Sequence, residues 1–194
     1  MKKLYLSDEV MVSDPCYTED TWCNTKLKNV KDGNYFAFAK KVDCGEWGGR
    51  ISKLSVIHEE HLKENLKWVR VRDTTIGVDS GQCGIFSLDT FRKDDIFATK
   101  SEFHKKFPSL NENSEPGEKW YGHMCDRTLD EEGWDTYFKG VVSRSGFGDG
   151  SYDVYVARSP RRIVGIMLDY HVDESRFAQF DWYKPLIDNK QVVL

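Results

Sequence analysis

The chain has no long apolar segment. Its most apolar stretch runs from Ile163 to Leu168, far short of the roughly 18 residues that a membrane-spanning helix requires. Near the start, Lys2 and Lys3 precede only a short apolar run, Leu4-Tyr5-Leu6, whereas a secretory signal needs an apolar region of about 7–15 residues. These absences predict a soluble protein without a membrane partner.

The sequence also lacks a cysteine framework. Its five cysteines are odd in number and none forms a C-x-x-C pair; they are Cys16, Cys23, Cys44, Cys83 and Cys125. Disulfide-stabilised domains carry paired cysteines and belong to oxidising compartments. We therefore expect reduced thiols and a cytoplasmic location.

An excess of positive charge is missing as well. Lys and Arg number 28 and Asp and Glu 32, which gives a formal net charge of −4. Proteins that bind the phosphates of nucleic acids normally show a basic excess or a basic stripe, so a nucleic-acid partner is not expected. The glycine-rich signatures of dinucleotide and nucleoside triphosphate sites are absent too, and no cofactor is predicted.

Aromatic residues, in contrast, are plentiful. Phe, Tyr and Trp make up 13% of the 194 residues, which excludes global disorder. A chain of this length can bury a sizeable core without disulfides or metals. We expect one domain over residues 1–194.

Short apolar segments with turn residues between them dominate the pattern. Leu4 to Ser13, Tyr35 to Ala39 and Ile163 to Tyr170 are typical of β-strands. Partial helical spacing occurs only at about residues 90–130, where Pro108 interrupts it. The pattern predicts an α+β fold, mainly an antiparallel sheet, with one or two helices inserted at about 90–130.

The sequence contains a possible internal repeat. Asp32 to Lys40 and Asp149 to Arg158 both begin Asp-Gly, a small polar residue and Tyr, and both continue as a strand. The next strands also correspond, because Arg50 to Val56 and Arg162 to Leu168 share an Arg-Ile start. Two equivalent hairpins are one interpretation, and shared turn chemistry is the other.

Three clusters place polar side chains next to Gly or Pro. They are Ser13-Asp14-Pro15-Cys16-Tyr17, Gly77-Val78-Asp79-Ser80-Gly81-Gln82-Cys83-Gly84 and Ser145-Gly146-Phe147-Gly148-Asp149-Gly150-Ser151-Tyr152. Each has a purely structural interpretation: a capped turn, a bulged strand and a hairpin turn. Each carboxylate also lies where a strand is expected to meet a loop, so we predict that Asp14, Asp79 and Asp149 share one edge of the sheet.

The functional interpretation is a binding site formed by these clusters. Clustered carboxylates repel one another, so a counter-charge from Arg127 or Arg144 is expected nearby. Trp22, Trp47 and Trp120 are available for stacking. The candidate ligand-binding residues are Asp14, Asp79, Ser80, Gln82, Cys83, Asp149, Arg127 and Arg144. The first hypothesis is a binding module for a small, polar, nucleotide-like ligand or for a protein partner.

The alternative hypothesis is an enzyme. A small hydrolase or transferase could use Asp14, Asp79 and Asp149, or Cys83 as a nucleophile with a histidine base. No complete catalytic motif supports it. A metal site is not predicted, because on an α-helix the H-x-x-H spacing of His58 and His61 places the two imidazoles about 300° apart.

Taken together, the three clusters resemble a known family. The elements Val12-Ser13-Asp14-Pro15, Gly77-Val78-Asp79-Ser80-Gly81 and Ser145 to Tyr155 look like those of uncharacterised bacterial and bacteriophage proteins, the domain of unknown function numbered 4241. The segment from Thr90 to Asp130 has no counterpart there, which suggests an insertion. The resemblance implies a microbial or phage accessory protein and assigns no catalytic residue.

Overall fold

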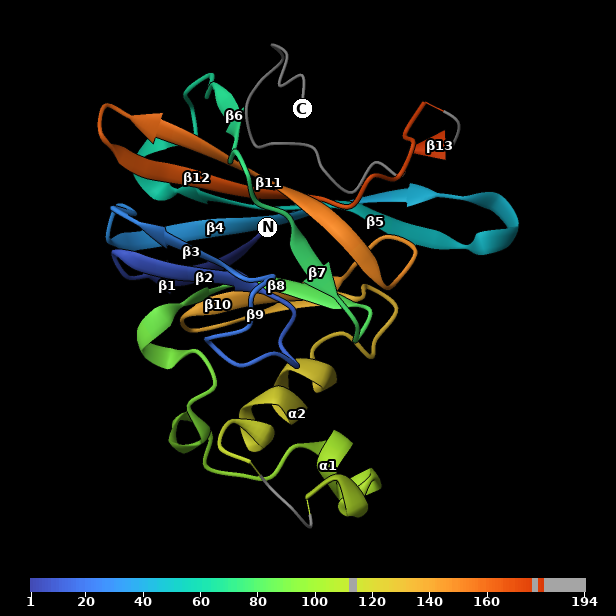
Figure 1. Cartoon of the computed structure of the whole chain (residues 1–194). Helices are drawn as coiled ribbons and strands as arrows, with labels where there is room; N and C mark the ends of the chain where they lie inside the picture. The colour runs from blue at the N-terminus through green and yellow to red at the C-terminus, as the bar shows by residue number, and fades with distance from the viewer. Residues whose placement is uncertain (112–114, 176–177, 180–194) are drawn as a thin grey trace.

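Two antiparallel sheets pack face to face and form most of the molecule (Figure 1). The computed structural model describes residues 1–111, 115–175 and 178–179. The larger sheet has the strand order β1 (Lys2–Leu6), β4 (Gly33–Asp43), β5 (Gly49–His58), β12 (Arg162–Asp169), β11 (Gly150–Ser159) and β6 (Trp68–Arg70). Two short strands join it, β7 (Ile76–Val78) beside β11 and β13 (Ala178–Gln179) beside β4.

The smaller sheet lies beneath the larger one in Figure 1. Its strand order is β3 (Thr25–Lys28), β2 (Glu9–Ser13), β8 (Gln82–Ser87), β10 (Gly140–Arg144) and β9 (Trp134–Tyr137). The main core lies between the sheets, where Leu54 and Ile166 of the larger sheet share one cluster with Ile85 of the smaller sheet. The predicted α+β class with a mainly antiparallel sheet is confirmed.

One predicted strand divides into two. The segment Leu4 to Ser13 forms β1 and β2, which belong to different sheets. The chain crosses between the sheets at Ser7, whose hydroxyl donates to the carbonyl of Glu9 and whose amide donates to the Ser87 hydroxyl. These contacts satisfy polar groups at the crossing, which the apolar pattern on either side does not reveal.

The repeated segments form two hairpins that lie side by side. β4 pairs with β5, β11 pairs with β12, and β5 pairs with β12 in the centre of the sheet. The sequence comparison equates Leu54 with Ile166 and Val56 with Leu168. In the sheet Leu54 lies opposite Leu168, and Val56 lies opposite Ile166. When each residue is replaced by its equivalent in the other hairpin, the first pair becomes the second pair. The equivalent hairpins are therefore arranged with approximate two-fold symmetry.

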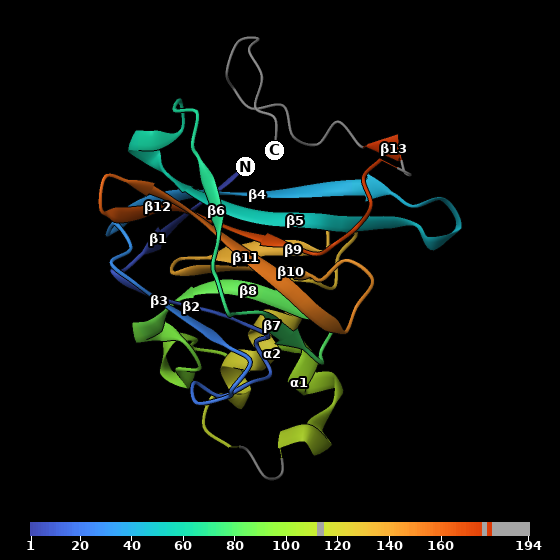
Figure 2. The same ribbon diagram turned by 45° about the horizontal axis from the view of Figure 1, so that its top comes forward.

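The predicted insertion holds the two helices, α1 (Glu102–Lys106) and α2 (Glu118–Asp126). Both lie below the smaller sheet in Figures 1 and 2. Five short 3-10 turns occur in the described residues, at Gly45–Trp47, Glu59–His61, Leu88–Thr90, Asp94–Ile96 and Pro108–Asn111. A second cluster packs this region onto the outer face of the smaller sheet, with Trp120 and Met124 of α2 against Phe86 of β8.

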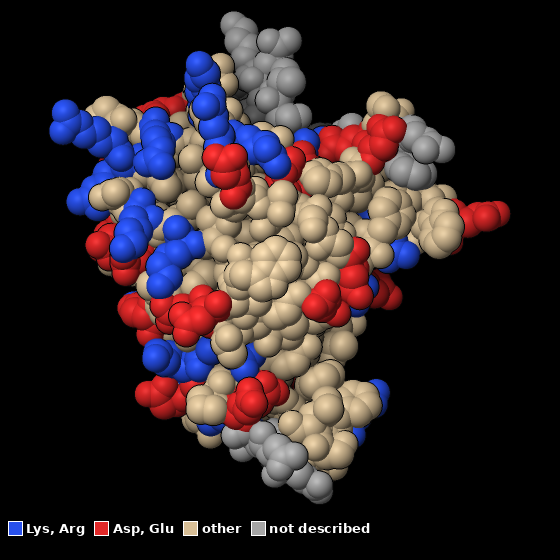
Figure 3. Space-filling view, in the orientation of Figure 1, with Lys and Arg blue, Asp and Glu red and all other residues tan. Residues whose placement is uncertain are grey.

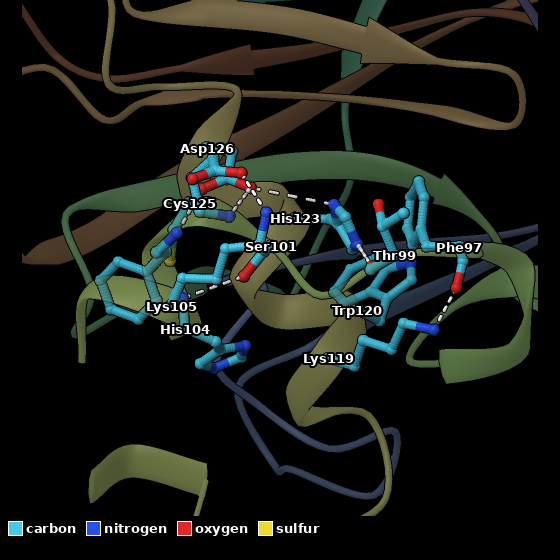
Figure 4. Close-up of polar contacts among 12 residues, drawn as sticks. Phe97, Thr99, Ser101, His104, Lys105, Lys119, Trp120, His123, Cys125 and Asp126 are labelled. Carbon is cyan, nitrogen blue, oxygen red and sulfur yellow. Dashed lines mark hydrogen bonds and ion pairs between the residues drawn. The ribbon is translucent and has the colours of Figure 1, made fainter. Parts of the chain in front are cut away.

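Polar contacts join the two helices (Figure 4). The Asp126 carboxylate accepts from the amides of Glu102 and Phe103, at 3.1 and 2.8 Å, and so caps the start of α1. His123 donates from Nε2 to the Thr99 carbonyl at 2.6 Å. The segment at about 90–130 is thus a packed unit. No helix among the described residues is long and apolar enough to cross a membrane.

Candidate functional site at the three motif loops

Asp14 is the centre of the site, and it is completely buried at the end of β2. Its Oδ1 accepts from the Cys16 amide at 2.8 Å and from the Ser80 hydroxyl at 2.7 Å. Its Oδ2 accepts from the amides of Asp79 and Ser80 at 2.9 and 2.7 Å. Pro15 ends the strand here, and three of these four hydrogen bonds tie the first cluster to the second.

Asp149 connects the third cluster to the second. Its Oδ1 accepts from the Gly81 amide at 3.0 Å, and the Ser145 amide donates to the Gly81 carbonyl at 3.0 Å. The loops that carry Asp14, Asp79 and Asp149 therefore meet at one end of the sandwich, as the sequence predicted. Asp79 and Asp149 are exposed. Tyr17 lies beside Asp79, and burial and a hydrogen bond to Asp79 raise the pKa of its phenol.

The predicted arginine counter-charge is wrong. Arg144 donates to the carbonyls of Thr128 and Asp130, both at 2.8 Å. Arg127 lies over the Phe97 ring, 5.7 Å from its centroid. Four hydrogen-bond donors satisfy the buried Asp14 carboxylate. The arginine that contacts this cluster is Arg92, whose guanidinium donates to the carbonyls of Pro15 and Cys16 at 3.1 and 3.2 Å.

Gly84 shows that a close backbone approach need not mark a ligand. A Cβ atom added there would lie 2.5 Å from the Val141 carbonyl oxygen and 2.2 Å from the Phe86 ring. The neighbouring strand β10 and the side chain of Phe86 fill this space. Glycine at this position is explained by strand packing.

Cys83 cannot serve as the predicted nucleophile. Its side chain is completely buried, and burial together with the Asp14 charge raises the pKa of the thiol well above its usual value. Little thiolate forms under those conditions, and the thiolate is the reactive species. Gln82 is buried too, and its amide nitrogen lies 3.5 Å from Cys125 Sγ.

Cys125 is flanked in the sequence by His123 and Asp126, but the three side chains do not form a nucleophilic triad (Figure 4). His123 uses Nε2 to bond the Thr99 carbonyl, and Asp126 caps α1. Burial raises the pKa of Cys125. Each of the three residues therefore has its own structural partner, Thr99 for His123, the start of α1 for Asp126 and Gln82 for Cys125.

The motif loops thus form a clamp. Both oxygens of Asp14 are occupied by backbone and hydroxyl donors, so this carboxylate has no free position with which to polarise water or hold a ligand. One carboxylate oxygen of Asp149 accepts a hydrogen bond from the Gly81 amide. The exposed carboxylates of Asp79 and Asp149 repel anions, so the arrangement does not favour a phosphate site.

The clamp presents an exposed aromatic pair. Phe147 lies in the third loop and is 52% exposed, and Trp47, in the β4–β5 turn, is 67% exposed. Their rings meet edge to face with centroids 6.4 Å apart. The Arg50 guanidinium lies 5.7 Å from the centroid of the Phe147 ring. Sequence reasoning singled out Trp47 but missed Phe147, although an aromatic residue between two glycines was the available signal.

The other two tryptophans considered for stacking, Trp22 and Trp120, lie away from this pair. Trp120 is completely buried in the core beneath the smaller sheet, so its predicted role in stacking on a ligand is wrong. Trp22 is 92% exposed.

The α-helical geometry that was assumed for His58 and His61 is also wrong. His58 ends β5 and His61 lies in a 3-10 turn, so their ring centroids are only 5.7 Å apart. Donor atoms of His58, Glu60 and His61 lie within 4.8 Å of one another. Lys31 Nζ bonds to the Glu60 carboxylate and lies 3.3 Å from His61 Nε2. A lysine ammonium therefore already neutralises this cluster.

Comparisons with protein-family models, with curated proteins and with solved structures find no match to this chain. The resemblance to the domain of unknown function numbered 4241 stays a prediction. The function must therefore be argued from the geometry of the site.

Proposed function

We propose that this chain is a binding module for a protein partner, and that Trp47, Phe147 and Arg50 form the centre of the contact surface. In keeping with the sequence resemblance, the module would be an accessory protein of a microbe or phage. The observation that carries the proposal is an exposed pair of large aromatic rings, contributed by two different loops and packed against an arginine. Trp and Arg are among the residues that contribute most to binding energy at protein interfaces.

The loop that carries Phe147 is held firmly in place. The Gly148 amide donates to the Ser145 carbonyl at 2.7 Å, and the Ser145 hydroxyl donates to the Gly148 carbonyl at 2.8 Å. The Tyr152 hydroxyl donates to the same two carbonyls, at 3.2 and 2.7 Å. A surface ordered before binding loses less conformational entropy when a partner docks. On this interpretation the Asp14 and Asp149 hydrogen bonds serve to fix the loop.

The surroundings of the aromatic pair favour a macromolecule over a small ligand. The β4–β5 hairpin, with Trp47 at its turn, reaches beyond the other strands in Figures 1 and 2. The adjacent crevice, lined by Arg50, Gly133 and Gly146 among others, encloses only about 10 Å³. Small-molecule sites are usually concave and measure about 300–1,000 Å³.

Site-specific photo-crosslinking tests the proposal. Benzoylphenylalanine is introduced at position 47, at position 147 or, as a matched control, at position 22, in cells that make the protein naturally. Trp22 is suitable because it is exposed but has no ring contact among the described residues. We expect one protein to be crosslinked from positions 47 and 147 and not from position 22.

Substitutions then measure the contribution of the pair. Trp47→Ala should weaken binding of the crosslinked partner about 30-fold, the effect of losing an interfacial hot spot of about 2 kcal/mol. Trp22→Ala should leave binding unchanged, and both variants should keep the melting temperature of the original chain. Equal crosslinking from position 22, or no crosslink from 47 and 147, would contradict the proposal.

A further inference from the structure

A second surface lies at the other end of the larger sheet, around β6 and the β11–β12 turn. Lys67, Arg70 and Arg72 come from β6 and its flanking residues, Arg158 comes from the end of β11, and Arg161 comes from the β11–β12 turn. Figure 3 shows Lys and Arg side chains gathered over this end of the molecule, at the upper left. The net charge of −4 conceals this local positive surface, because the two segments are distant in the sequence.

Most of these cations have no acidic partner. Arg70 pairs with Asp153 at 2.6 Å. Among the described residues no ion pair involves Lys67, Arg72, Arg158 or Arg161. Unpaired like charges create a positive potential that attracts anionic groups.

The basic residues border an apolar groove. Val69, Val71 and Val156 line it together with four of the cations, and it encloses about 460 Å³. Val69 is 53% exposed even though it belongs to a strand. Side chains alternate along a strand, so Val69 and Arg70 lie on opposite faces of β6, and Arg72 follows in a turn.

β6 also has an open edge. It is the last strand in the order of the larger sheet, and it pairs with β11 alone among the described strands. The Val71 amide donates to the Val154 carbonyl at 2.8 Å, so Val71 and Val69 direct their backbone groups toward β11. By the alternation of an antiparallel ladder, the backbone N–H and C=O of Arg70 point to the open side.

From these observations we infer that an extended, acidic peptide segment of a partner protein docks here by adding a strand to β6. Its backbone bonds to the open edge at Arg70, its apolar side chains cover Val69 and Val71, and its carboxylates face the arginines. This is the geometry of β-strand addition, in which the main chain supplies affinity and alternate side chains supply specificity. The surface is separate from the Trp47 surface.

The groove is less suited to nucleic acid. Its lining contains valines between the cations and no aromatic ring, whereas proteins that bind single strands stack bases on aromatic side chains. A further possibility is that the charges only protect the edge from self-association. Both alternatives are outcomes of the experiment below.

The probe is a short synthetic peptide of alternating valine and glutamate, measured by fluorescence anisotropy with the full chain. We expect binding that weakens as salt increases, and no binding of the matching valine–lysine peptide. Peptides that carry N-methyl groups along one edge or the other remove the backbone donors of that edge. One of the two N-methylated peptides should lose binding, because strand addition uses a single edge.

Variants of the chain locate the site. Arg72→Glu combined with Arg158→Glu should weaken peptide binding about tenfold or more, since each reversal converts an attraction into a repulsion. The matched control, Lys100→Glu with Lys106→Glu, changes the same charge at exposed positions in the insertion and should have little effect. Trp47→Ala should leave peptide binding unchanged.

Three outcomes would overturn the inference. Equal binding of both N-methylated peptides would show attraction by charge alone. Tighter binding of a short DNA duplex, lost in the Arg72 and Arg158 double variant, would assign the surface to nucleic acid. Self-association of that double variant without loss of peptide binding would show that the charges only protect the edge.

Discussion

Replacing Asp14 with alanine tests whether the motif loops form a clamp. The change removes both carboxylate oxygens and leaves the amides of Cys16, Asp79 and Ser80 without the acceptor that they now use. A buried polar group that loses its partner costs about 1–3 kcal/mol. Water can replace some of these contacts where Asp79 is exposed, so the total should be about 4 kcal/mol, within the 3–5 kcal/mol typical of breaking a buried charged network.

This loss is large compared with the roughly 5–15 kcal/mol that stabilises a typical domain. Because 1 kcal/mol shifts the melting temperature of a chain of this size by about 2–4 °C, Asp14→Ala should melt about 12 °C lower. Asp14→Asn should lose nearly as much stability. Its NH₂ group would replace one of the two carboxylate oxygens, and an NH₂ group cannot accept the hydrogen bonds donated at that position. Urea unfolding followed by tryptophan fluorescence measures the free energy of unfolding directly.

Asp149→Ala is the matched comparison. It removes one hydrogen bond, to the Gly81 amide, from an exposed carboxylate, and should cost about 1 kcal/mol. If Asp14→Ala cost no more than Asp149→Ala, the carboxylate would not hold the loops together. The clamp interpretation would then be wrong.

Three further predictions concern other parts of the molecule. Gly146→Ala should cost about 1–3 kcal/mol of stability, because φ is +49° and the added Cβ would lie 3.0 Å from Tyr170. Gly45→Ala, at φ +64° but with open space around it, should cost about 1 kcal/mol. Urea unfolding measures both. Iodoacetamide at neutral pH should alkylate the folded chain slowly at every cysteine. Four cysteines are buried, and the pKa of the half-buried Cys16 is raised by its partial burial. Cys16 should still react first because it is the most accessible of the five, and one fast thiol would contradict this. Burial lowers the pKa of His58 in the folded chain. As pH drops below about 6.5, the imidazole is therefore protonated in the unfolded chain before it is protonated in the folded chain, and stability should fall. His58→Gln should reduce that fall, and an unchanged pH profile would refute the assignment.

Local sequence determined most strand segments, the two repeated hairpins and the positions of the motif loops, but not the division of Leu4 to Ser13 between two sheets. A strand with apolar residues on one face must bury that face, and Gly and Pro set the turns, so these features depend on neighbouring residues. The repeat between the two hairpins was visible for the same reason. The convergence of Asp14, Asp79 and Asp149 was also predicted, because each was expected at the end of a strand.

The roles of individual side chains depended on tertiary structure. Whether Asp14 would bind a ligand or the chain itself was decided by the backbone amides of Asp79 and Ser80, which are distant in sequence. Burial likewise excluded Cys83 as a nucleophile and Trp120 as a stacking residue. Composition alone showed an acidic protein, and only the sheet brought Arg72 and Arg158 to one groove. Charge and exposure at a surface depend on which distant segments meet there, and the strand pairing determines that.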